Sequence, residues 1–321
     1  MRRGTLYAVL SLVLCCVFWG LSFPLMQMAA DQVARAGGWI DRSIVRDVAL
    51  RSTYIGWRFG LSGLLYGVLT LRWQRGYGAH EVRGGVIVAM FFAAGNILQM
   101  IGLRYALPSV SSVLTSMVVV FTPFAQYFLL RRRVGAATWQ AVVLALVGVI
   151  VLSFPNPSAA APLTLTTQAP VPWLGEGATL LASTLFTGQV LSVDHFGRSV
   201  EPRRLTFVMF AAASIVTLAF GVLLGGGALH TGAIVSALVT DPHFWSVNVA
   251  MVVICSVGAF HLMNTAQPLV SPAAAAVIYC MEPVFATAWS VVLGTESITW
   301  LTLAGGGLVV LAMIRLARAT E

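Results

Sequence analysis

The sequence contains no lysine, and its 321 residues include only 11 acidic side chains. Charged residues make up 9% of the chain, whereas soluble globular domains use about 25%. Hydrophobic residues make up 58%, and the mean hydropathy is +0.88. So few charges cannot cover a large water-exposed surface. The composition therefore excludes a sizeable soluble domain and indicates a polytopic membrane protein.

Cysteine is also scarce, and the motifs of common enzymes and ATPases are missing. The sequence has no paired aspartates, no cysteines or histidines at metal-ligand spacing and no G-x-x-x-x-G-K-[ST] phosphate loop. We therefore expect no cofactor, no metal site, no enzymatic activity and no ATP-driven transport by this chain alone. Four cysteines lie in apolar runs, where we expect small packing residues and not a disulfide framework: Cys15, Cys16, Cys255 and Cys280.

Long apolar runs dominate the chain instead. A run of about 20 residues forms a helix long enough to cross the ~30 Å hydrocarbon core of a bilayer, so the sequence predicts an all-α protein with ten transmembrane helices. The first run follows Arg2 and Arg3, as in a signal peptide, but it extends from Thr5 to Met28 and is too long for one. The predicted spans are 5–28, 54–71, 84–106, 109–130, 136–154, 173–193, 205–225, 245–267, 271–293 and 299–317.

The formal net charge of +8 comes from 19 arginines, most of them in short segments between the apolar runs. With a cytoplasmic N-terminus, thirteen arginines lie in inside segments and four, at positions 35, 42, 46 and 51, lie in one outside loop. The positive-inside rule therefore predicts a multi-pass protein of the inner (plasma) membrane with both termini in the cytoplasm. Because topology accounts for the arginines, we expect no nucleic-acid partner.

Two connections are longer than the others. Residues 31–53 are predicted as an extended external loop. The stretch Ile44–Trp57, which begins within this loop, alternates apolar and charged residues at helical spacing. This part is either an interfacial amphipathic helix that acts as a lid or a solvated loop. Residues 155–172 are uncharged and proline-rich, which predicts an external linker. The linker separates residues 1–154 from residues 173–321, and each part holds five spans.

The two parts resemble each other in sequence. A shift of 160 residues aligns VSSVLTSMVVVFTP with VSPAAAAVIYCMEP and pairs Pro123 with Pro283. Because five spans is an odd number, the second copy enters the membrane from the opposite side, which predicts an inverted repeat. Glu282 has Thr122 as its counterpart, so the site is expected to be charged in one copy and neutral in the other.

Glu282 lies near the middle of the predicted span 271–293, where a carboxylate that faced lipid would be costly. Pro283 has no amide hydrogen, so the Tyr279 carbonyl loses its helical partner and the helix is predicted to bend there. The functional interpretation makes Glu282 a counter-ion for a substrate amine or a proton carrier. The structural alternative is a hydrogen bond to a neighbouring helix.

Three stretches resemble EamA-type members of the drug/metabolite transporter superfamily: FWGLSF from Phe18, RYALPSVSSVLTSMVVVFTPF from Arg104 and MEPVFATAWSVVLGTES from Met281. The resemblance covers nearly the whole chain. It implies two inverted five-helix repeats, a central cavity that opens alternately to each side, and transport of small metabolites such as amino acids. The chain departs from the family pattern at Thr122, where members often have an acid, and at residues 131–133, where a Gly-Glu pair is common.

The candidate substrate-binding residues are polar or aromatic side chains within these spans. His261, Asn264 and Gln267 project from one helical face. Asn96 and Gln99 project from one face of the matching span in the first half. Arg58 lies four residues into its span, where it would either bind a substrate carboxylate or snorkel to the surface. The full set is Glu282, His261, Asn96, Gln99, Arg58, Trp19, Asn264 and Tyr279.

The sequence thus predicts a secondary transporter that exports an amino acid or a related metabolite by alternating access, with the solute and the bilayer as its partners. Proton coupling through Glu282 and His261, and assembly into a homodimer, stay open. The alternatives are a lipid or lipid-linked sugar flippase and a non-transporting membrane scaffold. An intramembrane serine protease, to which the GLSG stretch at Ser62 points, is disfavoured because the glycines around Ser62 fit close helix packing better.

Overall fold

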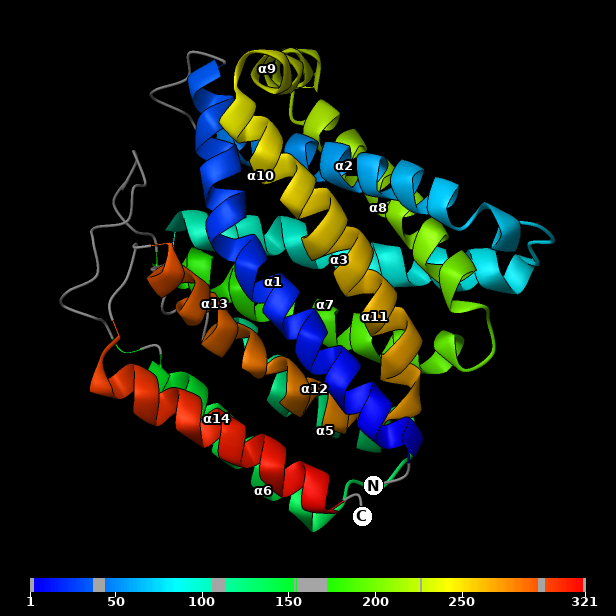
Figure 1. Ribbon diagram of the computed structural model, residues 1–321, viewed down its shortest axis with the longest axis vertical. Coiled ribbons are helices and arrows are strands. Elements are labelled where there is room, and N and C mark those ends of the chain that lie inside the picture. The colour runs from blue at the N-terminus through cyan, green and yellow to red at the C-terminus, as the bar shows by residue number, and fades with distance from the viewer. Residues whose placement is uncertain are drawn as a thin grey trace.

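The computed structural model of the chain describes residues 3–36, 44–105, 114–152, 154, 172–225, 227–293 and 298–319. Those residues form helices and short connections, and no β-strand occurs among them. Figure 1 shows the helices packed side by side at oblique angles, with the start of the first helix and the end of the last at the same end of the molecule.

The described helices follow the ten predicted spans. The first half forms α1 (Arg3–Ala36), α2 (Ile44–Leu69), the short η1 (Leu71–Trp73), α3 (Ala79–Tyr105), α5 (Val118–Phe128) and α6 (Ala136–Leu152). The second half forms α7 (Pro172–Gly197), α8 (Pro202–Leu223), α9 (Gly227–Thr240), α10 (Pro242–Val252), the π-helical η2 (Val253–Gly258), α11 (Ala259–Ala266), η3 (Gln267–Leu269), α12 (Pro272–Tyr279), α13 (Met281–Val292) and α14 (Trp300–Ala319).

Length and composition support a membrane location for these helices. Five described segments are long and apolar enough to cross a bilayer: Gly4–Ser22, Ala79–Gly102, Pro202–Leu223, Pro242–Leu269 and Pro272–Val292. Shorter apolar helices are Val118–Phe128, Ala136–Leu152 and Trp300–Leu316. Helices α2 and α7, with 26 residues each, complete the set. The prediction of an all-α protein with ten transmembrane helices in two repeats is confirmed.

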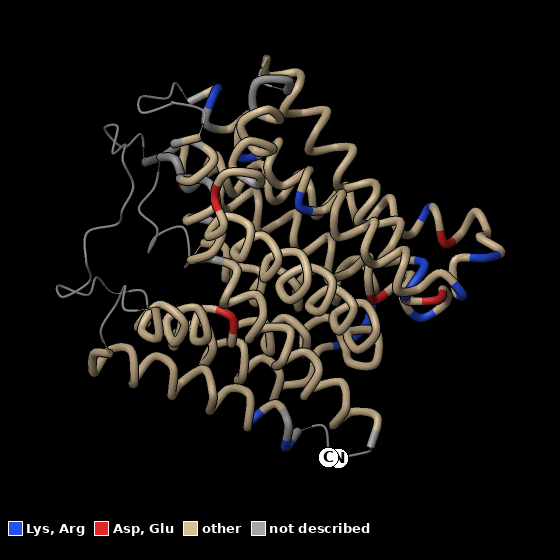
Figure 2. The backbone as a smooth tube through the Cα atoms, turned by 45° about the horizontal axis from the view of Figure 1, so that its top comes forward, with Lys and Arg blue, Asp and Glu red and all other residues tan. Residues whose placement is uncertain are grey.

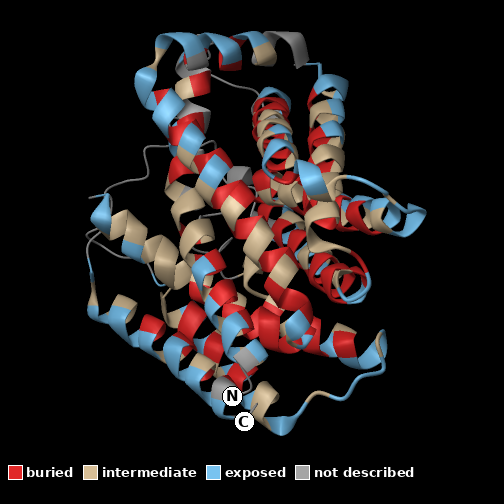
Figure 3. Ribbon diagram, turned by 45° about the vertical axis from the view of Figure 1, so that its right-hand side comes forward, coloured by how far each residue is buried: buried red, intermediate tan, exposed pale blue. Residues whose placement is uncertain are grey.

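Helix α9 was not predicted from the sequence. It lies across the ends of α1, α2 and α10, as Figures 1 and 3 show. Its Ile234 and Ala237 are buried, whereas Val239 on the outer face is 80% exposed. The Trp57 indole N–H donates a 3.3 Å hydrogen bond to the Thr231 hydroxyl and ties α9 to α2. An amphipathic helix therefore covers one end of the bundle.

Most of residues 31–53, predicted as an external loop, belong to the ends of helices α1 and α2. Helix α1 continues to Ala36, and α2 begins at Ile44, so Ile44–Trp57 forms the first turns of a long helix that continues into the membrane. Residues 37–43 and most of the predicted linker at 155–172 lie outside the described residues. The spacing of apolar and charged residues correctly predicted a helix at Ile44–Trp57, but it did not show that this helix continues to Leu69.

Each repeat interrupts a helix before its proline, at Cys280 in the second repeat and at Ser116 and Met117 in the first. In the second repeat α12 ends at Tyr279 and α13 begins at Met281, and the intervening Cys280 amide bonds to the Val277 carbonyl three residues back (3.2 Å). In the first repeat α5 begins only at Val118, after a turn, with Pro123 inside it. The predicted break of the second helix is therefore present, and it has a counterpart in the first repeat.

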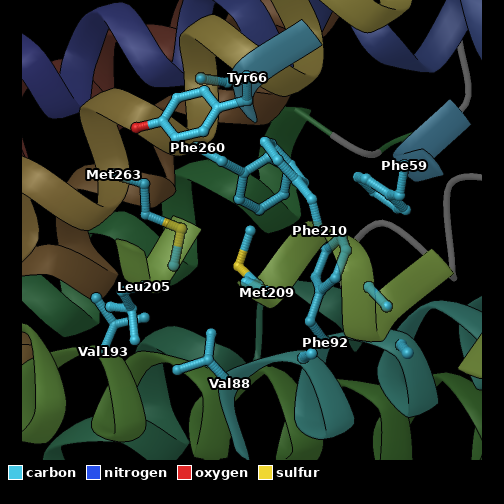
Figure 4. Close-up of a cluster of buried hydrophobic side chains, with 14 of the residues drawn as sticks. Phe59, Tyr66, Val88, Phe92, Val193, Leu205, Met209, Phe210, Phe260 and Met263 are labelled. Atoms are coloured by element: carbon cyan, nitrogen blue, oxygen red, sulfur yellow. The ribbon is translucent and has the colours of Figure 1, made fainter. Parts of the chain in front are cut away.

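Three clusters of buried side chains hold the helices together, two larger ones and a third that joins α1, α2, α9 and α10. The first joins α2, α3, α7, α8 and α11, and Figure 4 shows its aromatic centre. There the Phe59 ring lies 5.0 Å from Phe92 and 5.9 Å from Phe210, and the Phe210 ring lies 5.7 Å from Phe260. The second cluster joins α1, α5, α6, α12 and α14. None of the three clusters includes Glu282, which lies in α13 beside the second.

Many of the charged residues lie together at one side of the molecule, where Figure 2 shows blue and red positions close to one another. The end of the bundle at which α5 and α7 end is called the arginine-rich end below. There the Asp194 side chain is 1% exposed, and its carboxylate lies 2.6 Å from the Arg132 guanidinium. Arg198 also bonds to Asp194 at 2.6 Å and donates to the Val270 carbonyl. This ionic group joins the connection after α5, in the first repeat, to the end of α7, in the second.

Helices α6 and α14 touch backbone to backbone at Gly148 and Gly305. A β-carbon on Gly305 would lie 2.6 Å from the Leu152 amide nitrogen and 2.7 Å from the Gly148 carbonyl oxygen. Neither backbone atom can move without shifting its helix, so only glycine fits at this contact.

Replacing Gly305 by Ala is therefore expected to separate the two helices and to destabilise the protein by about 1 to 3 kcal/mol, the usual cost of overpacking. Gly307 is the matched control, because a β-carbon there meets no atom within 4 Å. Thermal unfolding of the purified variants in detergent measures the difference. Equal midpoints for Gly305→Ala and Gly307→Ala would contradict the packing argument.

Candidate functional site

Glu282 lies on the stripe of α13 that faces α1. Ala286 and Trp289 follow it by four and seven residues and so share its helical face. A β-carbon on Gly20 of α1 would lie 2.7 Å from the Ala286 amide nitrogen, and the Trp289 indole N–H donates a 3.0 Å hydrogen bond to the Val17 carbonyl. Glu282 is therefore turned toward a protein helix and away from the lipid-facing side of α13.

The Glu282 carboxylate has no ion pair and no hydrogen bond to any residue that the structure describes. It is partly buried and lies within electrostatic range of the Cys15 and Cys16 thiols on α1. The Cys16 thiol itself donates to the Ile278 carbonyl, at 3.5 Å. A carboxylate at this depth is costly without a cation, a proton or water. The described residues thus leave this charge without a partner.

Two predicted aromatic residues lie beside this carboxylate. The Trp19 ring is 5.4 Å from the Tyr279 ring and 5.4 Å from the Phe260 ring. Tyr279 precedes Glu282 by three residues, on the same side of the broken helix. Its hydroxyl donates a 2.7 Å hydrogen bond to the Gln267 side-chain oxygen. Trp19, Tyr279 and Glu282 therefore come together from α1, α12 and α13.

Thr122, the repeat counterpart of Glu282, shares this lack of a partner. Thr122 is fully buried, and its hydroxyl oxygen has no hydrogen-bond partner among the described residues. A buried hydroxyl is usually bonded. The two repeat-related positions thus each keep a polar oxygen unpaired beside a broken helix.

Arg58 does not snorkel to the surface. It is 6% exposed, and its guanidinium donates from Nε to the Ser256 hydroxyl (2.8 Å) and from Nη2 to the Cys255 carbonyl (3.3 Å). Both acceptors belong to the π-helical segment η2, whose wider turn leaves backbone carbonyls free to accept such bonds. No carboxylate pairs with Arg58 in the part of the chain that the structure describes.

A chain of ring contacts leads from Arg58 to Glu282. The Arg58 guanidinium lies 5.2 Å from the Phe59 ring centroid, and Phe59 lies 6.0 Å from Phe260. Phe260 contacts Trp19, which contacts Tyr279, the residue one turn before Glu282. The cation and the anion thus border the same aromatic wall, formed by Phe59, Phe260, Trp19 and Tyr279.

The predicted polar stripe on α11 bonds to several neighbouring helices. His261 Nδ1 lies 2.8 Å from the Tyr66 hydroxyl on α2, and Asn264 donates a 3.0 Å bond to the Thr206 hydroxyl on α8. Neither residue is hydrogen-bonded to Glu282. The Asn264 side-chain oxygen is buried and has no partner among the described residues. These contacts join helices and leave one acceptor unused.

The two predicted polar residues on α3 also form hydrogen bonds, one within the helix and one to a neighbouring segment. Asn96 donates a 2.9 Å bond to the Phe92 carbonyl of its own helix, whereas Gln99 donates a 3.2 Å bond to the Thr115 hydroxyl in the interrupted span. The side chain of Arg104 lies outside the described residues. Gln99 therefore connects α3 to the segment that leads into α5.

Sequence reasoning missed Ser256, the main partner of Arg58, because nothing in the local sequence signals a π-helical turn. Gln267 was recognised as polar but not as the partner of Tyr279; its amide also donates to the Val190 carbonyl at 2.7 Å. The alignment of the repeats was the one signal that pointed to Thr122.

Comparison with known proteins agrees with this architecture. A protein from Archaeoglobus fulgidus described as an uncharacterized transporter is 24% identical over 310 residues, which cover 96% of this chain and 85% of that protein. A crystal structure described only as that of a protein superimposes with a TM-score of 0.64 at 17% identity and covers 98% of both chains, which shows a shared fold. The EamA-like transporter family model matches residues 6–154 and 173–317. The chain therefore belongs to the EamA-like transporter family.

Proposed function

We propose that this secondary transporter moves a small zwitterionic metabolite, an amino acid or a close relative, out of the cell by alternating access. The observation that carries the proposal is Glu282, a carboxylate without a partner among the described residues, turned toward α1 at a broken helix. An intramembrane ionisable group in this setting is a binding-site candidate by default. A positively charged substrate amine satisfies the carboxylate.

Arg58 supplies the complementary group for the substrate carboxylate. A guanidinium has five N–H donors, and two atoms of Arg58 donate to Ser256 and Cys255, so donors remain for a ligand. The aromatic wall of Phe59, Phe260, Trp19 and Tyr279 would contact the apolar part of the solute. We place Asn96, Gln99, His261 and Asn264 around this space, where unused amide and imidazole groups can bind polar atoms.

Alternating access follows from the two repeats. The ionic group of Asp194, Arg132 and Arg198 closes the arginine-rich end, since it ties the repeats together there. Opening that end requires these bonds to part while the opposite end closes. We place the arginine-rich end and both termini in the cytoplasm of a cell with this protein in its plasma membrane. Proton exchange at Glu282 and His261 would couple the cycle to a pH gradient.

Replacing Glu282 by Gln removes the charge at nearly constant shape, so counterflow of labelled amino acids in proteoliposomes should fall about tenfold or more. Any stimulation by an imposed pH gradient should also disappear. Glu176→Gln is the matched control, because Glu176 is exposed on α7. Normal flux in Glu282→Gln, with the protein inserted and folded, would overturn the proposal.

Replacing Arg58 by Met keeps the length of the side chain but removes the guanidinium. We expect KM for the transported amino acid to rise about tenfold, while transport of the decarboxylated amine changes little, because only the amino acid offers a carboxylate. Competition between the two solutes against the same labelled substrate measures this preference. An equal loss for both solutes would assign Arg58 a structural role at η2 instead.

A further inference from the structure

The face formed by α6 and α14 carries a groove that the transport mechanism does not use. Its volume is about 690 Å³. Val143, Val147, Leu311 and Ile314 form its apolar walls and are 60%, 44%, 53% and 42% exposed, respectively. Arg315 and Arg318 line the groove at the end of α14. Figure 1 shows both helices at the periphery of the bundle, so the groove faces the surroundings.

The groove is apolar along most of its length and basic at one end, as one membrane leaflet is apolar in its interior and polar at its headgroups. Trp139 and Val147, which both line it, are eight positions apart on α6, so the groove extends about 12 Å along that helix, close to the ~15 Å of hydrocarbon in one leaflet. Trp139 lies near the start of α6, as expected of an aromatic residue at a membrane interface. The two arginines lie at this same end, at the level of headgroups.

Arg315 is held ready for an anion. Its Nε and Nη2 donate to the Gln140 side-chain oxygen at 3.0 and 2.6 Å, which fixes the guanidinium across the groove. Neither Arg315 nor Arg318 forms an ion pair with a described residue. The groove therefore combines apolar walls with two arginines at one end that have no ion pair among the described residues.

We propose that this groove binds a phospholipid with an anionic headgroup from the leaflet at the arginine-rich end. One acyl chain lies between α6 and α14, and the phosphate accepts bonds from Arg315 and Arg318. Basic pockets between transmembrane helices at this level bind such headgroups. The site is separate from Glu282 and would hold the lipid whatever solute the protein carries.

The charges disfavour a second copy of the chain as the occupant. Two copies related by an axis along the membrane normal would bring Arg315 and Arg318 of each copy face to face. Asp194, a described acid at this end, is 1% exposed and already bonded to Arg132 and Arg198, so it cannot neutralise them. Repulsion between these like charges opposes such a dimer. An anionic lipid is attracted to the same arginines instead.

Native mass spectrometry of the detergent-solubilised protein tests the proposal with dioleoylphosphatidylglycerol, dioleoylphosphatidylcholine and soluble glycerol phosphate as probes. We expect phosphatidylglycerol to bind best. Arg315→Gln with Arg318→Gln should weaken it roughly 25-fold, about fivefold for each arginine. Val143→Trp, which fills the groove without changing charge, should weaken both lipids. Arg75→Gln with Arg83→Gln is the charge-matched control, because these exposed arginines lie outside the groove.

Three results would overturn the proposal. Equal losses in the groove variant and in the control variant would show binding to net charge alone. Full competition by glycerol phosphate, together with normal binding in Val143→Trp, would show a free-anion site without an acyl chain. A dimer that Val143→Trp dissociates would show that the groove is an interface between copies.

Discussion

The cost of leaving a carboxylate unpaired inside a membrane is the constraint on which this structure depends. Water is scarce at that depth, so a buried charge needs a counter-ion, a proton or a hydrated space. Glu282 has neither an ion pair nor a hydrogen bond within the described chain, yet its helix turns it toward α1. The proposed binding and release of a cationic solute group would resolve this conflict, because the partner would come from outside the protein.

The two repeats show how the fold lowers the free-energy cost of such a site. Each repeat breaks a helix before its proline, and backbone irregularity at membrane depth is tolerated where protein or water surrounds it. The second repeat adds a carboxylate where the first has Thr122. Arg58 adds the opposite charge through a π-helical turn in η2. Approximate symmetry supplies the two opposing bundles, and local asymmetry supplies the chemistry.

Sequence reasoning recovered what apolar length and proline chemistry determine. The ten spans follow from runs that match a bilayer, and the break after Tyr279 follows from the missing amide of Pro283. Helix α9 was missed because its 14 residues are too few for a membrane span, so they were taken as part of the connection between two spans. The bond from Arg58 to Ser256 was not predictable, since it depends on how α2 meets η2. Side-chain partners depend on tertiary packing that spacing along one helix does not contain.

The central claim is that position 282 is open to water and substrate, and substituted-cysteine labelling tests it most directly. Glu282→Cys is made in a chain whose four native cysteines are replaced by alanine, and a charged, water-soluble thiol reagent is added to proteoliposomes. The account predicts that the reagent modifies position 282 from at least one side of the membrane. Failure to label from either side of the membrane, while an exposed control cysteine at position 176 reacts, would contradict it.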